Sequence, residues 1–418
     1  MKENMLPRPL VCAFSITGIV SLLTCSALAN DWPGWRGSDR TDRSPEKGLL
    51  KEWPAGGPKQ LWIYKDAGKG YSGPAVVDGG FYTMGTKGTE EVIIALDAVS
   101  GQERWKSAVG EVLSNDWGDG PRSTPAVDGD RVYALGGKGD LVCVSAKDGK
   151  QLWKKSMKEL GGSVPGWGYT ESVLVDGDRV LCTPGGAQGA VVAFAKDSGK
   201  LLWQSADFTD GAQYSSVIAV HHNGAHQYVQ LTMKSIVGLA ADSGKVLWKA
   251  DWPGRTAVIP TPIFADGHVY VSSGYGVGCK LAKVGSDNQV TTVYENKVMK
   301  NHHGGVILVG EHLYGYSDGS GWVCQNFKTG EEVWSSKNLG KGPVSFADGM
   351  LYCVEEDTGN VALVEATPKG WTEKSRFKLE PQTTIRARSG RIWTHPVISN
   401  GRLYLRDQDL VFAYNIKG

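Results

Sequence analysis

The sequence predicts an all-β fold, an eight-bladed β-propeller of four-stranded antiparallel blades. The first observation is a repeat in which glycine, three residues and tryptophan recur, mostly every 45 to 50 residues. The five glycine–tryptophan pairs are Gly101 and Trp105, Gly149 and Trp153, Gly199 and Trp203, Gly244 and Trp248, and Gly330 and Trp334. A fixed period of this length is typical of repeat architectures, and it suits one propeller blade per unit.

The second observation is a turn signal inside each unit, usually Asp-Gly between two short apolar runs. Examples are Asp78-Gly79, Asp128-Gly129, Asp176-Gly177, Asp266-Gly267 and Asp348-Gly349. Asp-Gly favours a tight hairpin, because type I′ turns need positive φ at both central residues. A glycine-rich loop, a third apolar run and a fourth strand with the tryptophan follow, which gives four strands per unit.

The number of units follows from their first strands. We expect these near Ala75, Ala126, Val173, Val217, Ile263, Val306, Val344 and Val397. The eighth unit reaches Gly418 without a fourth strand, but the segment around Trp62 repeats the pattern around Trp153. The N-terminal strand should therefore complete the last blade and close residues 59–418 into a ring, which removes open sheet edges.

One aromatic residue per blade is expected to act as a wedge between neighbouring blades. Tyr294 and Phe377 take this place where the tryptophan is missing. Each ring buries on the order of 150–250 Å². The predicted docking residues are Trp62, Trp105, Trp153, Trp203, Trp248, Tyr294, Trp334 and Phe377.

Residues 1–29 resemble a signal peptide rather than part of the fold. Lys2 and Arg8 precede an apolar run, and residues 27–29 fit the small-x-small cleavage pattern after Ala29. Lipid attachment through Cys25 is less favoured, because Thr24 is a poor residue before a lipidated cysteine. We expect a periplasmic or secreted protein, with residues 30–58 as an ordered strap leading to the closing strand.

Composition excludes several classes. The formal net charge is +1 with mixed signs along the chain, whereas nucleic-acid binding needs a basic face. The five cysteines after the leader have no C-x-x-C partner, so neither zinc nor a disulfide framework is indicated. We expect no transmembrane span, a monomer, and a small molecule or an extracytoplasmic protein as partner.

The repeat resembles the pyrroloquinoline quinone (PQQ) propeller repeat, Ala-x-Asp-x-x-x-Gly-x-x-x-Trp. Residues 95–105 match it in full, from Ala95 through Asp97 and Gly101 to Trp105, and the resemblance covers 59–418. It is similar to exported eight-bladed members labelled PQQ-binding-like. Such repeats occur in quinoprotein alcohol and sugar dehydrogenases and in a non-catalytic lipoprotein that helps assemble outer-membrane barrels.

The resemblance leaves two functions open. The dehydrogenases add an adjacent Cys-Cys pair, a calcium set of Glu, Asn and Asp, and a catalytic Asp, and this chain has no adjacent cysteines. The favoured hypothesis is therefore a ligand- or protein-binding scaffold without an assigned catalytic residue. The alternative is a compact dehydrogenase that uses PQQ with calcium.

A binding site is expected on the channel face where the inner strands begin, because unusual side chains concentrate there. Long loops at 109–122, 157–169 and 378–393 open onto this face and also bring Trp117. For each rim residue a loop-stabilising role is the alternative; Glu171 is also a candidate general base, and no metal site is assigned to the adjacent histidines. The predicted rim residues are Tyr71, Arg122, Trp167, Tyr169, Glu171, Tyr214, His302, His303, Lys341, Arg386, Arg388, Trp393 and His395.

Overall fold

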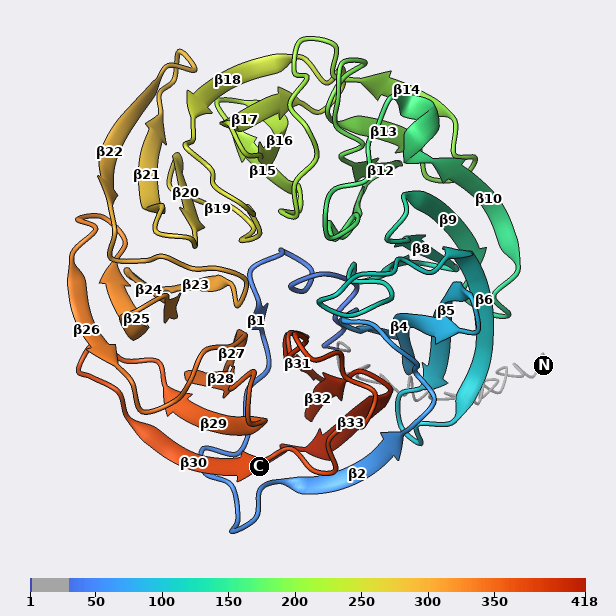
Figure 1. The fold of residues 1–418 in the computed structure, drawn as a ribbon, viewed down its shortest axis with the longest axis vertical. Helices are drawn as coiled ribbons and strands as arrows, with labels where there is room; N and C mark the ends of the chain where they lie inside the picture. Colours follow the sequence, from blue (N-terminus) through green and yellow to red (C-terminus); the bar gives the residue numbers. More distant parts are fainter. Residues whose placement is uncertain (2–29) are drawn as a thin grey trace.

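The computed structural model describes Met1 and residues 30–418. The described chain forms eight sheets around a central axis, seven of four strands and one of five (Figure 1). The predicted signal peptide and its cleavage site lie outside the described residues. Each blade has four antiparallel strands, and a short strand of the N-terminal segment adds in parallel to one blade, so the predicted fold class is confirmed. None of the helices in the described part of the chain is long and apolar enough to cross a membrane.

The first four blades run from the innermost to the outermost strand in chain order. Blade 1 contains β3 (Ala75–Val77), β4 (Gly80–Lys87), β5 (Glu90–Asp97) and β6 (Glu103–Glu111); blade 2 contains β7 (Ala126–Asp128), β8 (Arg131–Leu135), β9 (Asp140–Ser145) and β10 (Gln151–Ser156). Blade 3 contains β11 (Leu174–Asp176), β12 (Arg179–Cys182), β13 (Val192–Ala195) and β14 (Leu201–Gln204); blade 4 contains β15 (Ile218–His222), β16 (Ala225–Leu231), β17 (Ser235–Ala240) and β18 (Val246–Asp251). The short 3-10 helix η1 (Met157–Leu160) follows β10.

The remaining blades repeat this order. Blade 5 contains β19 (Ile263–Ala265), β20 (His268–Ser273), β21 (Gly278–Val284) and β22 (Val290–Asn296); blade 6 contains β23 (Val306–Val309), β24 (His312–Ser317), β25 (Gly321–Asn326) and β26 (Glu332–Ser336). Blade 7 contains β27 (Val344–Ala347), β28 (Met350–Val354), β29 (Asn360–Glu365) and β30 (Glu373–Lys378); blade 8 contains β31 (Val397–Ser399), β32 (Arg402–Asp407), β33 (Leu410–Asn415) and β2 (Lys59–Tyr64).

The ring closes as the sequence predicts. The N-terminal strand β2 pairs antiparallel with β33, the last strand of the chain, and Trp62 lies opposite Ala413. The first strands begin at the expected residues except in blades 3 and 4, where they begin one residue later, at Leu174 and Ile218.

The inner hairpins use two turn chemistries. Asp78 and Gly79 both have positive φ, 48° and 68°, which is the type I′ arrangement. In blades 2 and 3 the strand instead extends through the aspartate, and the two turn residues begin at Gly129 and Gly177. Glycine then takes the first turn position, where type II′ turns require it.

Neighbouring blades are joined by a recurring aromatic contact, which we call the dock. The fourth-strand tryptophan donates its Nε1–H to a backbone carbonyl in the next blade, for example from Trp153 to Lys196 at 2.9 Å. Its ring lies against the repeat glycine of that blade, which has positive φ. The donors to such carbonyls are Trp62, Trp105, Trp153, Trp203, Trp334 and, through its hydroxyl, Tyr294.

Two predicted dock residues make different contacts. Trp248 is buried, but its Nε1 donates to Gln227 Oε1 at 2.7 Å within its own blade. Phe377 packs on Gly57 and Trp53 of the strap, because the strap leads into the outer strand of blade 8.

The strap, residues 30–58, passes through the central channel. It starts beside Asn400, at an inner hairpin turn, and Trp32 pairs with Val76 of β3. It turns at the other end of the channel and returns as β1 (Arg43–Ser44), which pairs in parallel with β27 (Figure 1). Arg36 and Arg40 on this path are buried, so the chain's own N-terminal segment fills the channel.

Candidate functional site

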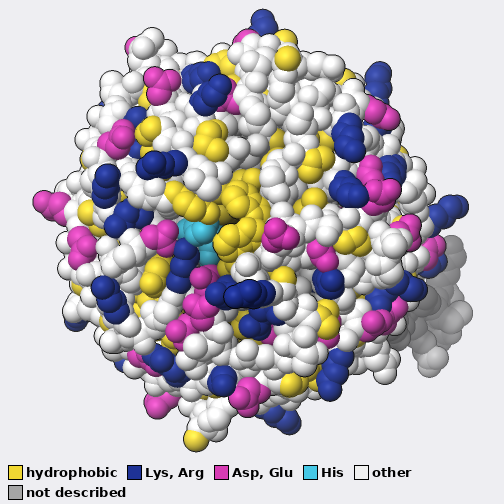
Figure 2. Space-filling model, viewed as in Figure 1, with side chains coloured by type: hydrophobic (Ala, Val, Ile, Leu, Met, Phe, Trp, Pro, Cys, Tyr) yellow, Lys and Arg dark blue, Asp and Glu magenta, His cyan; other side chains and the backbone are white. Residues whose placement is uncertain are grey.

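A cavity of about 180 Å³ opens at the channel end where the inner strands begin. Figure 2 shows apolar side chains gathered at the centre of this face, with histidine beside them. We call this cavity the mouth. Its lining residues are Trp35, Tyr71, Trp117, Arg122, Trp167, Thr170, Tyr214, Ser216, Ala257, Ile259, Tyr275, His302, His303, Trp393 and His395.

Rim loops of neighbouring blades bring the aromatic rings together. Tyr71 lies 4.8 Å from Trp393 between ring centroids, and Trp117 lies 6.5 Å from Trp393. The Tyr71 hydroxyl donates to the Trp117 carbonyl at 2.6 Å. Gly118, with φ of 118°, makes this approach possible, because a Cβ there would collide with the Tyr71 hydroxyl.

Arg122 is held at the edge of the mouth. Its Nε donates to the Trp167 carbonyl at 3.0 Å and its Nη2 to the Gly118 carbonyl at 2.8 Å, while the guanidinium lies 4.9 Å from the Tyr71 ring centroid. Burial lowers the pKa of Arg122 from its usual value. Within residues 30–418 its Nη1 has no hydrogen-bond partner, so the two N–H groups of this nitrogen remain for a ligand.

His302 presents a fixed tautomer to the mouth. Its Nδ1 lies 2.8 Å from Lys341 Nζ, which in turn contacts Asp318 at 2.8 Å. An ammonium group can only donate, so Nδ1 accepts and the proton sits on Nε2. Burial, with the neighbouring His303 and Lys341, lowers the pKa of His302 to about 2, so the ring is neutral.

His303 and Trp393 share one carboxylate. Glu356 Oε2 lies 2.7 Å from His303 Nε2 and accepts from Trp393 Nε1 at 2.9 Å. Burial alone would raise the pKa of Glu356, but the hydrogen bond and charge of His303 outweigh it and lower that pKa. The pair fixes both rings in the mouth wall.

Eight of the thirteen predicted rim residues line the mouth, and five do not. Tyr169 is buried in the core of blades 2 and 3, and its hydroxyl donates to the Pro184 carbonyl. Lys341 lies behind His302, Arg386 pairs with Asp407, and Arg388 is exposed. The eight are Tyr71, Arg122, Trp167, Tyr214, His302, His303, Trp393 and His395.

Glu171, the fifth, is fully buried beneath the mouth. Its carboxylate accepts from the Thr183 amide at 2.7 Å and hydroxyl at 3.0 Å. Burial raises the pKa of Glu171 to about 7. It does not line the mouth, so the geometry does not favour a general base acting there.

Sequence reasoning missed several lining residues. Trp35 comes from the strap and belongs to no repeat, so aligning the units could not find it. Thr170 and Ser216 occupy neighbouring positions of aligned residues, and strand alternation is the signal that could have found them.

Comparison with known proteins identifies the repeat. Residues 88–336 match the model of a family described as outer membrane protein assembly factor BamB. The chain belongs to this family. Comparison with curated proteins gives no significant match.

Solved structures share the fold of this BamB family member at low identity. BamB from Moraxella catarrhalis has a TM-score of 0.61 at 17% identity, with 86% of this chain and 97% of that chain covered. A quinohemoprotein alcohol dehydrogenase from Comamonas testosteroni has a TM-score of 0.63 at 12% identity, covering 93% and 81%. Another, from Pseudomonas putida HK5, has 0.65 at 15%, covering 93% and 80%. The fold is thus a PQQ-like propeller related to both groups.

Proposed function

We propose that this chain is an exported binding propeller whose mouth takes a small planar molecule rich in hydrogen-bond acceptors. Residues 1–29 are proposed as its signal peptide, 30–58 as its strap and 59–418 as its propeller. We infer the class of ligand from the balance between hydrogen-bond donors and acceptors at the mouth. Planar aromatic walls suit a flat ligand, and a few polar groups orient it.

Four of the nitrogens left free at the mouth are donors, and a fifth, the buried Nδ1 of His303, donates or accepts according to the tautomer of the ring. Among the described residues no hydrogen bond involves Arg122 Nη1, His302 Nε2 or the indole nitrogens of Trp117 and Trp167. The lining contains neither a carboxylate nor a carboxamide, and its hydroxyls can donate or accept. A ligand with a carboxylate or carbonyl oxygens complements this set, whereas a cationic ligand would leave donors facing donors.

A calcium-assisted dehydrogenase fits the mouth poorly. Calcium takes six to eight oxygen ligands, largely carboxylates and carbonyls, and the lining offers no carboxylate. The nearest acidic groups are already paired: Glu356 with His303, Asp42 with Arg36, and Asp318 with Lys341. Within the described chain no cluster of three or more metal-ligating side chains is suited to a metal ion.

Calorimetry with two matched probes tests the proposal. The probes are 2-naphthoate and 2-naphthylmethylammonium, which share a ring system and carry opposite charges. We expect 2-naphthoate to bind one site with a dissociation constant on the order of 10–100 µM, as suits so small a ligand. The cation should bind at least tenfold more weakly, because it offers no acceptor.

The same titration separates the alternatives. Equal affinity for both probes, or no binding of either, would contradict the proposed ligand class. PQQ is titrated with and without calcium: binding that needs calcium, together with oxidation of alcohols or sugars, would support the dehydrogenase instead. If no small molecule binds and an extracytoplasmic protein occludes the mouth, the propeller is a protein scaffold and the small-molecule proposal is wrong.

A further inference from the structure

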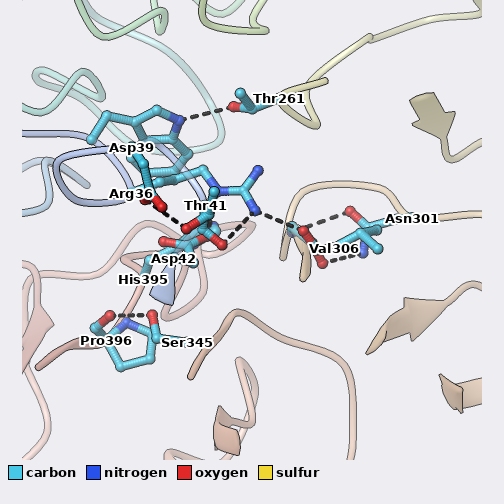
Figure 3. A network of polar contacts seen from close by, with 12 residues as sticks. Arg36, Asp39, Thr41, Asp42, Thr261, Asn301, Val306, Ser345, His395 and Pro396 are labelled. Atoms are coloured by element: carbon cyan, nitrogen blue, oxygen red, sulfur yellow. Dashed lines mark hydrogen bonds and ion pairs between the residues drawn. The ribbon is translucent and has the colours of Figure 1, made fainter. Parts of the chain in front are cut away.

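The tip of the strap, residues 35–42, lies directly beneath the mouth. Trp35 lines the cavity, its Nε1 donates to Thr261 Oγ1 at 2.9 Å, and its ring lies 4.6 Å from that of His395. Figure 3 shows Arg36 and Asp42 of this tip together with His395. The strap therefore forms the floor of a cavity whose walls come from the blades.

Two buried arginines fix the tip to several blades at once. Arg36 Nη2 donates to the Val306 carbonyl in blade 6 at 2.7 Å, as Figure 3 shows. Arg40 Nη1 donates to Val217 at the start of blade 4 at 2.7 Å, and its Nη2 to Ser172 before blade 3 at 3.1 Å. Both side chains are almost completely buried. The tip is thus held by the inner edges of the ring, on different sides of the channel.

Asp42 joins the tip to the mouth wall. Its Oδ2 lies 2.7 Å from Arg36 Nε and 3.2 Å from His395 Nδ1. Its backbone carbonyl accepts from the Phe346 amide in blade 7 at 2.8 Å. His395 Nε2 lies 3.2 Å from the His303 carbonyl. A continuous set of contacts therefore leads from the strap to two histidines of the mouth.

The backbone of the tip is strained. Arg36, Arg40 and Asp42 have φ of 62°, 57° and 59°, in the left-handed region that side-chain-bearing residues rarely adopt. Such conformations persist only where the surroundings hold them, and they concentrate at functional sites. The buried guanidinium and carboxylate contacts supply that restraint here.

We propose that the strap tip is part of the binding site, with Trp35 contacting the ligand and Arg36, Arg40 and Asp42 acting as positioning residues. Ligand binding and docking of the tip then stabilise each other, since coupling between two binding events is reciprocal. This inference rests on the proposed function of the mouth. It differs from a purely structural role, in which the strap only fills the channel.

Two tryptophans of the strap provide a matched pair of variants. Trp35 lines the mouth, whereas Trp32 is buried against blade 1 and does not. Each is changed to leucine, and the affinity of the folded protein for 2-naphthoate is measured by calorimetry. We expect Trp35→Leu to weaken binding at least tenfold, Trp35→Phe to recover most of it, and Trp32→Leu to change it less than twofold.

Hydrogen exchange of the strap tests the coupling, because a strap with a purely structural role would exchange at the same rate with and without ligand. In the wild type, saturating 2-naphthoate should slow exchange of the Arg40 and Asp42 amides, which bond within the tip, at least fivefold. Arg40→Lys loses the two-pronged contact; it should speed exchange of these amides and weaken 2-naphthoate binding at least fivefold.

The outcomes separate the two proposals. If the wild type does not bind 2-naphthoate, the proposed function of the mouth fails and this inference with it. If the wild type binds but Trp35→Leu binds within twofold of it, or the ligand leaves strap exchange unchanged, the strap is only a channel filler. The mouth would then stand as a ligand site without it.

Discussion

Two sets of aromatic rings in this propeller are built from the same residue type and behave differently. At the docks, the indole of Trp153 donates to the Lys196 carbonyl and lies against Gly199 of the next blade. At the mouth, Trp117 and Trp167 leave their indole nitrogens without a protein acceptor in the described chain. Aromatic rings on the fourth strands hold blades together, whereas aromatic rings on the rim loops and the strap surround a cavity.

The difference has a physical origin. A dock ring has a satisfied N–H and a glycine packed on its face, so neither surface nor donor is left for a ligand. At the mouth, by contrast, the indole N–H groups of Trp117 and Trp167 have no acceptor among the described residues, and Trp117 is 46% exposed. Substitutions at the docks should therefore affect mainly stability, and substitutions at the mouth mainly ligand binding.

The largest effect is expected at a dock. Trp153→Ala removes a buried ring and its hydrogen bond, and should lower the free energy of unfolding by about 3–5 kcal/mol. Trp117→Ala, at the mouth, should cost less than about 1 kcal/mol, because the ring is half exposed. Denaturant unfolding of both variants checks this, and similar losses for the two would abolish the division.

A pair of glycines isolates the dock contact from backbone strain. Gly149 has φ of 72°, and a Cβ there would lie 2.5 Å from Trp105 Cε3. Gly129 has φ of 56° and nothing within 4 Å of such a Cβ. Both alanine variants carry a strain of about 1–2 kcal/mol. Gly149→Ala should be destabilised by about 2 kcal/mol more than Gly129→Ala, because overpacking adds to strain; equal Tm values would contradict this.

Glu171 tests whether a residue predicted for the rim belongs to the core. Burial raises its folded pKa to about 7, above the unfolded value near 4.3. The folded state binds this proton more tightly than the unfolded state does. The protonated carboxyl group therefore stabilises the fold fully below about pH 4, and this stabilisation is lost as pH rises to about 7. As pH rises from 4 to 8, the free energy of unfolding of Glu171→Gln should therefore increase by on the order of 1–3 kcal/mol relative to that of the wild type. A pH-independent difference would contradict the shift.

Two arginines give the smallest effects and the sharpest contrast in binding. Arg122→Gln should weaken 2-naphthoate binding about tenfold, near 1.4 kcal/mol, because a charge-assisted hydrogen bond is lost. Arg388→Gln, on an exposed loop outside the mouth, should change affinity less than twofold and stability by less than about 0.5 kcal/mol. Calorimetry and thermal unfolding of both variants make the comparison, which fails if Arg388 matters as much as Arg122.

The parts predictable from sequence are those encoded within one repeat or by its spacing. The docks and the closing strand around Trp62 follow from local pattern. Tyr169 and Glu171 were predicted for the rim, but alternation in the extended segment turns Thr170 toward the mouth and its two neighbours into the blade. The place of Trp35 depends on long-range contacts of the strap, which no periodic pattern records.

The most direct test is a crystal structure of the protein with 2-naphthoate. We expect the naphthalene ring to lie in the mouth, beside Tyr71 and Trp393 and above Trp35, with its carboxylate within hydrogen-bond distance of Arg122 Nη1. A ring bound between blades or on the outer strands, with the mouth filled by water alone, would contradict it.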